Sequence, residues 1–129
     1  MLGQARVNLA GWFVYPLNMS LSASVNAVDE HAVQVYQNSD FQVWQVQFFD
    51  TQTTNPGQFS VKWGTSNLFF MPDYVLVPNI WGQGNLVHRL PEPVTFPRGS
   101  IIAVSLRNET ANARTVYIAF EGINVNVNQ

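Results

Sequence analysis

The stretch SLRNETANARTVYIAFEG, from Ser105 to Gly122, contains two runs of alternating apolar and polar residues separated by the polar segment NETANA. Alternation with a period of two residues is typical of strands that bury one face. The apolar residues that share a face are Ile102, Val104 and Leu106 before this segment and Val116, Ile118 and Phe120 after it. We therefore predict a hairpin that turns at NETANA, with its register set by the two buried faces. The alternative interpretation of the polar segment is a binding role for Asn108, Glu109 or Asn112.

The same alternation recurs along the rest of the chain, in MSLSASVNAV, HAVQVYQ, FQVWQVQFF, FSVKW, NLVHRL and SIIAVSLRN. Residues that favour turns and loops are concentrated in QNSD, TQTTNPGQ, NIWGQGN and PEPVTFPRGS. The stretch LFFMPDYVLVPNIW is apolar on both faces and contains Pro72 and Pro78, so we expect short strands or a loop across the core there. About eight strands predict an all-β protein, a jelly-roll-like antiparallel β-sandwich, with a seven-stranded immunoglobulin-like sandwich as the alternative.

The chain has 129 residues, a length that suits one domain with a core of its own. We therefore predict that residues 1–129 form a single β-sandwich domain. The first dozen residues alternate poorly, so residues 1–13 are expected to form either an extended N-terminal arm or a first edge strand. Gly122 is expected to let the last strand bend or to let another backbone come close.

Charged residues make up 11% of the chain, less than half of the roughly 25% that is usual for soluble domains. Asn, Gln, Ser and Thr take their place on the polar faces of the strands. A neutral polar surface suits a subunit held among neighbours better than a free enzyme. The net charge is −2 and the six basic residues are scattered singly, whereas nucleic-acid binding needs several cations in one place. We therefore expect no nucleic-acid partner.

The chain has no apolar run that approaches the ~18 residues of a membrane span. The N-terminal segment MLGQARVNLAGWFVYPLN has no apolar core of signal-peptide length. We therefore expect no membrane partner and no Sec export. The absence of cysteine excludes disulfides, thiolate nucleophiles and cysteine metal sites.

Residues that could carry catalysis are few and scattered. His31 and His88 lie far apart in the sequence, each in a strand-like run, which favours surface or sheet-edge histidines. Asp29 and Glu30 are adjacent, so on a strand they face opposite ways and form no acid–base pair. Motifs for a nucleophile elbow, a phosphate-binding loop or a zinc protease are absent. We therefore predict a protein that is not an enzyme, without catalytic, cofactor-binding or metal-binding residues; the alternative is a calcium site built from Asp40, Asp50 and Asp73.

The four tryptophans are Trp12, Trp44, Trp63 and Trp81. Trp44 and Trp63 are in phase with apolar neighbours, which predicts that they pack in the core. Trp81 is in the segment PNIWGQGN, where we expect a loop. An exposed aromatic ring among amides would suit either sugar binding or a contact between subunits.

Three local features together resemble small β-rich virion structural proteins of tailed bacteriophages. They are the pair Asp40-Phe41 at the start of a strand, the turn from Pro97 to Ser100, and the segment NETANARTVYIAFEG that ends at Gly122. The resemblance extends from Ala27 to Ile123. Within that group, the size and the single domain are similar to those of jelly-roll capsid decoration proteins, also called cement or auxiliary head proteins.

The resemblance implies a non-enzymatic protein that is made in the host cytoplasm and binds the outside of the virion capsid, where it stabilises junctions between shell subunits. Its partners would be the major capsid protein and further copies of itself, as a dimer or a trimer. Apolar residues without a clear inward phase, in the arm and in residues 67–81, are the candidate contacts. They are Val7, Leu9, Trp12, Phe13, Phe69, Phe70, Met71, Tyr74 and Trp81.

Three other functions are alternatives to capsid decoration. A tail, neck or fibre-tip module would bind host-surface carbohydrate through Trp81 and nearby amides, and it would be present in fewer copies per virion. A free carbohydrate-binding module would need an export signal and an attached catalytic domain. A small hydrolase on a jelly-roll scaffold would need a metal cluster, which the two separated histidines do not supply.

Overall fold

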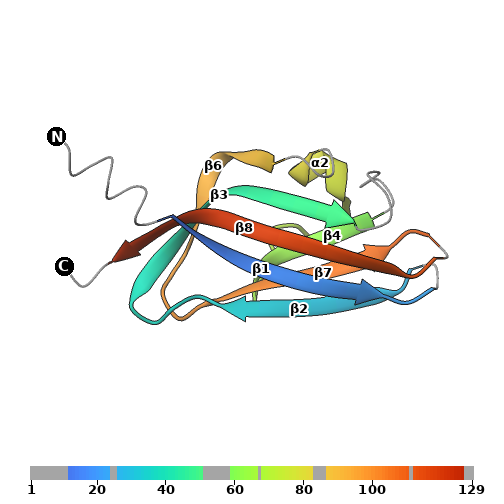
Figure 1. The fold of residues 1–129 in the computed structure, drawn as a ribbon, viewed down its shortest axis with the longest axis horizontal. Helices are drawn as coiled ribbons and strands as arrows, with labels where there is room; N and C mark the ends of the chain where they lie inside the picture. Colours follow the sequence, from blue (N-terminus) through green and yellow to red (C-terminus); the bar gives the residue numbers. More distant parts are fainter. Residues whose placement is uncertain are drawn as a thin grey trace.

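The computed structural model describes residues 12–23, 26–50, 59–66, 68–82, 87–110 and 112–126. Eight strands and one short helix lie within these ranges (Figure 1). They are β1 (Trp12–Leu21), β2 (Val28–Gln34), β3 (Ser39–Asp50), β4 (Phe59–Thr65), β5 (Val75–Leu76), α2 (Val77–Trp81), β6 (Val87–Phe96), β7 (Ile101–Asn108) and β8 (Arg114–Asn126). The predicted all-β fold with about eight strands is confirmed.

The strands form two four-stranded antiparallel sheets that pack face to face. The β1 sheet has the order β1-β8-β3-β6, and the β2 sheet has the order β2-β7-β4-β5. The pairings are nested, since β1 pairs with β8, β2 with β7, β3 with β6 and β4 with β5. This is the strand order of a jelly roll, in which one long hairpin is rolled into two sheets. The jelly-roll prediction therefore holds, and the immunoglobulin-like alternative does not.

The connection at NETANA is not a hairpin, so that prediction is wrong. β7 pairs with β2 and β4, whereas β8 pairs with β1 and β3, and the chain between them crosses from one sheet to the other. Both alternating faces are buried as predicted. They face each other across the core, because alternation identifies the buried face of a strand without identifying its neighbour in the sheet.

Asn108 organises this crossing and is fully buried. Its side-chain nitrogen donates to the carbonyl oxygens of Ser22 at 3.1 Å and Asn112 at 2.8 Å. Its side-chain oxygen accepts from both the backbone N–H and the hydroxyl of Thr110. Its backbone N–H donates to the carbonyl oxygen of Ala27 at 2.8 Å. Asn108 therefore joins two loops at one end of the sandwich, and its amide is not available for the alternative binding role.

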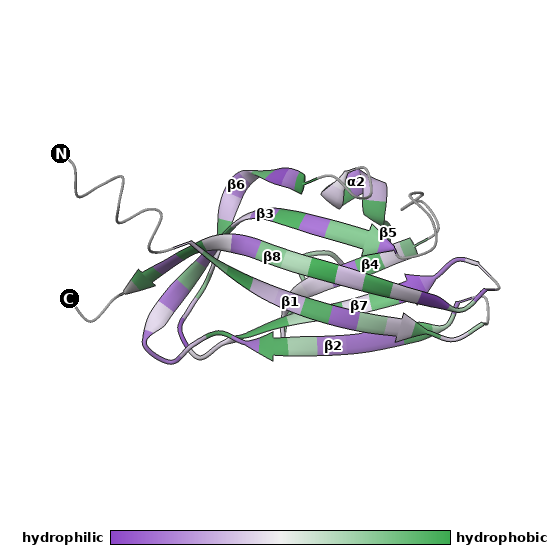
Figure 2. Cartoon of the chain, viewed as in Figure 1, coloured by the Kyte–Doolittle hydropathy of each residue, from purple (hydrophilic) through white to green (hydrophobic). Residues whose placement is uncertain are grey.

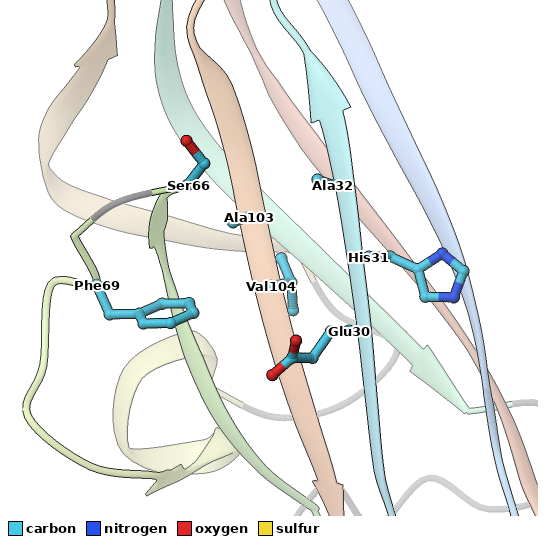
Figure 3. Close-up of a pocket in the computed structure, with 7 residues that line it drawn as sticks. All are labelled: Glu30, His31, Ala32, Ser66, Phe69, Ala103 and Val104. Carbon is cyan, nitrogen blue, oxygen red and sulfur yellow. The ribbon is translucent and has the colours of Figure 1, made fainter.

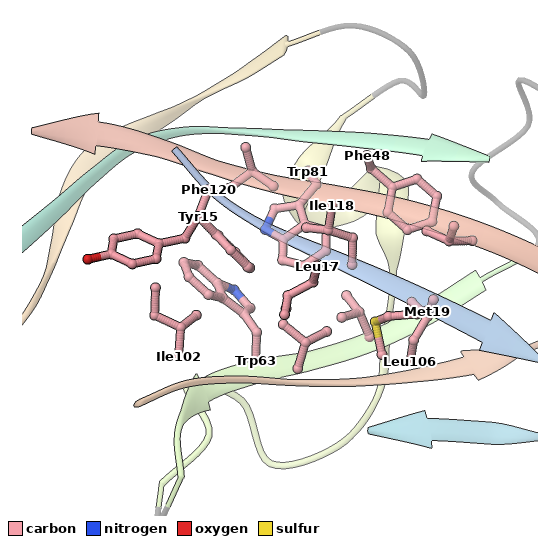
Figure 4. Packing of buried hydrophobic residues seen from close by; sticks show 14 of the residues in the cluster. Tyr15, Leu17, Met19, Phe48, Trp63, Trp81, Ile102, Leu106, Ile118 and Phe120 are labelled. Carbon is pink, nitrogen blue, oxygen red and sulfur yellow. The ribbon is translucent and has the colours of Figure 1, made fainter. Parts of the chain in front are cut away.

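The core lies between the sheets and is rich in aromatic rings (Figure 4). Trp63 of β4 stacks on Phe120 of β8 with ring centroids 5.3 Å apart, which links the two sheets. Trp81 of α2 packs edge-on against both of these rings. The bands of alternating hydropathy along the strands in Figure 2 are the sequence counterpart of this one-sided burial. The core position predicted for Trp63 is confirmed.

A β-bulge interrupts β3 at Trp44. The buried residues on its two sides are Phe41, Val43, Val46 and Phe48. The extra residue of a bulge shifts the alternation by one, so both pairs reach the core although strict alternation places them on opposite faces. The prediction that Trp44 packs in the core is wrong, because Trp44 is the extra residue and is only half-buried.

Two segments predicted as loops have regular structure. PEPVTF belongs to β6, which lies at the edge of the β1 sheet, and Pro91 and Pro93 fall between Arg89 and Val94, in a stretch without register partners on β3. NIW belongs to α2, a five-residue helix that follows the two-residue strand β5. Pro78 suits the first turn of this helix, because a backbone N–H would have no intrahelical partner there.

Each edge strand is protected against pairing with another sheet. β6 contains the two prolines, and β5 has only two residues. β1 and β2 lie side by side, and the Asp29 carboxylate of β2 accepts the backbone N–H of Ser20 at 3.0 Å. The hydroxyl of Tyr15 likewise accepts the backbone N–H of Tyr36 at 3.1 Å. Contacts with other molecules are therefore expected at the sheet faces rather than at the edges.

Candidate functional site

The outer face of the β1 sheet, away from the core, displays large apolar side chains. Trp12 and Val14 of β1, Phe49 of β3 and Tyr117 of β8 are between 38% and 42% exposed. Phe49 and Tyr117 are directly opposite each other in the ladder, and their rings stack with centroids 6.4 Å apart. We call these four residues the β1-sheet patch. Because three paired strands carry it, its geometry is set by the sheet and not by a loop.

Neutral amides occupy much of the space around this patch. Gln45 donates through Nε2 to the Glu121 carboxylate, which gives this charge a neutral partner on the face. Asn18 and Gln47 line a shallow depression of about 220 Å³ beside the stacked rings. Amides both donate and accept hydrogen bonds without the desolvation cost of a full charge, so this face suits contact with another protein.

A specific protein contact on this side of the molecule would have to use the outer face of the β1 sheet almost whole. Four strands about 4.8 Å apart and about 33 Å long, for a ten-residue strand such as β1, give a flat area of roughly 600 Å². A standard interface buries about 800 Å² of accessible surface on each partner. The whole sheet face, and not the patch alone, is therefore the area that a partner would cover.

Residues 68–74, between β4 and β5, are attached to the outer face of the β2 sheet by predicted contact residues. The ring of Tyr74 has the cations of Lys62 and Arg107 at 4.7 and 4.6 Å from its centroid. Its hydroxyl is 2.7 Å from that of Ser105. The Lys62 ammonium also lies 5.2 Å from the centroid of Phe69. These two aromatic side chains therefore hold the segment on its own domain.

Met71 and Phe70 of the same segment differ in exposure. Met71 packs against the core, and its sulfur accepts the backbone N–H of Trp63 at 3.4 Å. Phe70 packs edge-on against Trp63 but keeps 47% of its surface exposed. Leu68, which was not predicted as a contact, is 70% exposed. Leu68 and Phe70 are thus the exposed apolar pair of this segment.

Of the predicted N-terminal contact residues, Trp12 and Phe13 belong to β1, and Val7 and Leu9 precede it in the sequence. Trp12 begins the strand and faces outward as part of the β1-sheet patch. Phe13 packs against the core, with its ring 4.8 Å from that of Tyr15. Residues 12 and 13 therefore belong to an edge strand and not to an arm. Val7 and Leu9, with the rest of residues 1–11, lie outside the described residues.

The prediction of an exposed loop at Trp81 is wrong. Trp81 is the last residue of α2 and is 1% exposed. Val77 and Trp81 are four residues apart, so one turn of helix places both on the face that meets the core. The burial of this indole removes the residue on which a sugar-binding tail module was based.

Charged groups of the β2 sheet form pairs, one at its edge beside β1 and one on its outer face. His31 Nε2 is 3.0 Å from Asp29 Oδ2. Glu109 Oε2 accepts the Ser60 hydroxyl at 2.6 Å and lies 2.7 Å from Arg107 Nε. The hydrogen bond from Ser60, followed by that from Arg107 and its charge, holds the pKa of Glu109 below its ordinary value.

The three aspartates of the alternative calcium site have separate partners. Asp40 accepts the Arg98 backbone N–H, Asp73 accepts that of Tyr74, and Asp50 lies 3.8 Å from Arg114 Nε. Among the residues that the structure describes, no group of three or more His, Asp or Glu side chains is placed to hold a metal ion. The described part of the chain also contains no helix of the length and apolarity that crossing a membrane requires.

Comparison with known proteins adds no family. No protein-family model matches the chain, and no curated protein matches it. The chain is similar in structure to dimeric latent PorU from Porphyromonas gingivalis, with 10% identity and a TM-score of 0.31, over 88% of this chain and 13% of that one. It is also similar to VP2 of the infectious bursal disease virus subviral particle, with 8% identity and a TM-score of 0.29, over 86% of this chain and 38% of that one. The chain thus spans well under half the length of each.

Three residues of the β1-sheet patch were missed in the sequence. Val14, Phe49 and Tyr117 follow the alternation of their strands, but on the face that looks away from the core. The detectable sequence feature was a large apolar residue at an outward position, as in the pair Phe48-Phe49 at the end of β3. Recognising that the three share one outer face, with Phe49 and Tyr117 as neighbours, requires the pairing of β1, β8 and β3, which alternation does not provide.

Proposed function

We propose that this protein is a non-enzymatic structural subunit of a virion, a capsid decoration protein that binds the outside of the head through the outer face of its β1 sheet. The observation that carries the proposal is the β1-sheet patch, in which Trp12 and Val14 near one end and the stacked rings of Phe49 and Tyr117 near the other share one outward sheet face that also carries amides. Aromatic residues with few charges around them are typical of the central part of protein interfaces.

The fold also supports docking by a face. Strand addition at the edges is opposed by the prolines of β6, by the shortness of β5 and by the mutual cover of β1 and β2. A sheet face fixed by its ladders changes little in shape on binding, which lowers the entropic cost of association. A shell that offers many identical sites suits such a rigid, lightly charged subunit.

The resemblance to phage virion proteins supports the choice of partner, namely the major capsid protein and further copies of this chain. A jelly roll alone does not specify a function, because the same fold supports several. The case therefore depends on the surface and on the sequence features from Asp40-Phe41 to Gly122. Stabilisation of subunit junctions follows if one copy contacts two neighbouring shell subunits.

Co-sedimentation with expanded, undecorated heads of the virus that encodes the chain tests the proposal. The wild-type protein is expected to saturate at a simple ratio to the shell subunit. The double variant Phe49→Ser/Tyr117→Ser is expected to weaken binding at least tenfold, because it removes the stacked rings of the patch. Both residues are at least 40% exposed, so the variant is expected to keep its fold by circular dichroism.

The matched control is Leu68→Ser/Phe70→Ser, which removes the exposed apolar pair from the β4–β5 segment and leaves the patch intact. Unchanged binding of this control, with loss in the patch variant, supports docking through the β1 sheet. The reverse result moves the contact to residues 68–74 and overturns the assigned face. Failure of the wild-type protein to bind heads overturns the decoration function itself.

A further inference from the structure

A trough of about 290 Å³ lies on the outer face of the β2 sheet (Figure 3). Its lining residues are Glu30, His31, Ala32, Ser66, Phe69, Ala103 and Val104. Figure 3 shows Phe69 on one side and Glu30 on another, with the imidazole of His31 pointing away. The proposed capsid contact does not use this trough, because it belongs to the other sheet.

The floor of the trough is formed by the small residues Ala32 of β2 and Ala103 of β7, which are partners in the ladder. The next partner in this row, Gly64 of β4, lies under the backbone of Phe69. The neighbouring row is formed by Glu30, Ser105 and Lys62, whose side chains include two long ones. A row of short side chains beside a row of longer ones leaves a depression whose depth the sheet itself fixes.

The wall of the trough is the ring of Phe69. The backbone of Phe69 forms a bridge with Gly64, which is a close approach that a side chain at position 64 would prevent. The Lys62 ammonium over the ring adds a cation–π contact. The ring is therefore held in place before any ligand arrives, which lowers the entropic cost of binding.

The polar groups of the trough combine hydrogen-bond donors and acceptors. Ser105 Oγ donates to Glu30 Oε2 at 3.3 Å and lies 2.7 Å from the Tyr74 hydroxyl, which leaves Tyr74 as the donor to Ser105. This chain orients the Glu30 carboxylate and leaves its other oxygen as an acceptor. The Ser66 hydroxyl lies across the trough from Glu30 (Figure 3). Lys62 offsets the charge of Glu30 within the same row, so the surroundings favour a neutral ligand.

We propose that this trough binds one neutral sugar ring. The C–H face of a pyranose would lie on the Phe69 ring, and its hydroxyls would donate to Glu30 and exchange hydrogen bonds with Ser66. Ligand pockets usually measure about 300–1,000 Å³, so a trough at the lower limit fits one monosaccharide unit and not a long oligosaccharide or a nucleotide. The site is independent of capsid docking, since the two sheet faces look in opposite directions.

The test is an NMR titration of the ¹⁵N-labelled full chain with three probes: methyl β-D-glucopyranoside, methyl β-D-galactopyranoside and N-acetyl-D-glucosamine. A shallow site with one aromatic wall is expected to bind with a Kd of about 1–10 mM, so each probe is added to about 50 mM. At least one probe is expected to cause saturable shifts in the amides of Ala32, Ser66, Phe69 and Ala103. Absence of saturable shifts with all three probes overturns the site.

Two variants test the location of binding. Phe69→Ala removes the wall and is expected to weaken binding at least tenfold. Ala32→Leu fills the trough and leaves Phe69 and its Lys62 contact in place, so it is expected to abolish the shifts. This second variant keeps the test valid even if Phe69→Ala disturbs residues 68–74. Ala119→Leu makes the same change on the outer face of the β1 sheet and is the matched control. Loss of binding only in Ala119→Leu, or shifts that persist in Ala32→Leu, would overturn the assignment.

Discussion

Gly122 of β8 lies against the backbone carbonyl of Gln42 on β3, so that any Cβ at position 122 would collide with that oxygen. The contact is next to the bulge, since Gly122 pairs with Val43 immediately before the register shifts. The predicted close approach of another backbone at Gly122 is thereby confirmed. Gly122 does not have a positive φ, so the requirement for glycine is steric and not conformational.

Gly122→Ala is accordingly expected to destabilise the protein by about 2–4 kcal/mol, because the paired strands must separate to admit a methyl group. Urea denaturation followed by tryptophan fluorescence measures this change. Gln42→Ala keeps the carbonyl and removes only a half-buried side chain, so it is the control and should cost less than about 1 kcal/mol. Equal losses of stability in Gly122→Ala and Gln42→Ala would show that the close approach of the two backbones does not require glycine at position 122.

Asn108→Ala is expected to lower the free energy of unfolding by about 3 kcal/mol. The substitution leaves the carbonyls of Ser22 and Asn112 and the Thr110 N–H without their buried amide partner. Thermal and urea unfolding are the measurements. Asn112→Ala is a matched control in the same connection, because the backbone of Asn112 bonds to Asn108 and Thr110 while its side chain is exposed. A larger loss for Asn112→Ala than for Asn108→Ala would contradict this role.

Trp81→Ala is expected to cost about 3–5 kcal/mol, as for other buried aromatic residues. Trp81→Phe keeps most of the packing. Within the described residues the indole N–H has no hydrogen-bond partner, so the phenylalanine variant should lose less than about 1.5 kcal/mol. Chemical denaturation measures the free energy of unfolding of both variants. Similar losses of stability in both variants would mean that the indole N–H, and not the volume of the ring, provides the stabilisation by Trp81.

Quenching of tryptophan fluorescence is an independent measurement of the burial of Trp81. Trp12 is 41% exposed, whereas Trp63 and Trp81 are 5% and 1% exposed. Acrylamide should therefore quench the wild-type emission in part, and Trp12→Phe should remove much of the accessible fraction. Strong quenching that remains in Trp12→Phe and disappears in Trp81→Phe would contradict the buried position of Trp81.

The stability contribution of Glu109 is expected to depend on pH. Its pKa is lowered by the Ser60 hydrogen bond and by Arg107, so the folded state favours the carboxylate. A lowered pKa stabilises the fold above the unfolded pKa, and the gain is lost as the pH falls through the folded pKa. Ser60→Ala should therefore cost about 1.5 kcal/mol at pH 7 and progressively less below about pH 4.5. A cost that is constant with pH would contradict the linkage.

The positions of most strands were predictable because burial of one sheet face imposes a period of two on each strand separately. Sequence alone therefore located the buried faces of β7 and β8 and the core position of Trp63. It failed where a local feature changed the phase. The bulge displaced Trp44, and a five-residue helix turned Trp81 into the core. The prolines of β6 were misread because an edge position, where they are tolerated, is a property of the sheet.

The candidate site was less predictable than the fold. Trp12 was identified as a contact, but Phe49 and Tyr117, which share its outer face, come from distant strands and are placed there only by the β1-β8-β3 ladder. Phe69 and Tyr74 were identified as outward contacts, and the structure shows them held by Lys62 and Arg107 on their own domain. Contacts between side chains of different strands depend on how the connections arrange the strands in the two sheets, which local sequence patterns do not encode.

The sequence by itself determined that this protein is all-β, which faces of β7 and β8 are buried, and that its surface is neutral and polar, because these properties depend on residue type and local period. Only the tertiary structure decided that β7 and β8 belong to different sheets, that Trp81 is internal and that Trp12, Phe49 and Tyr117 share one outer face. The physical reason is that strand partners are selected by packing of the whole core, which couples residues far apart in the chain.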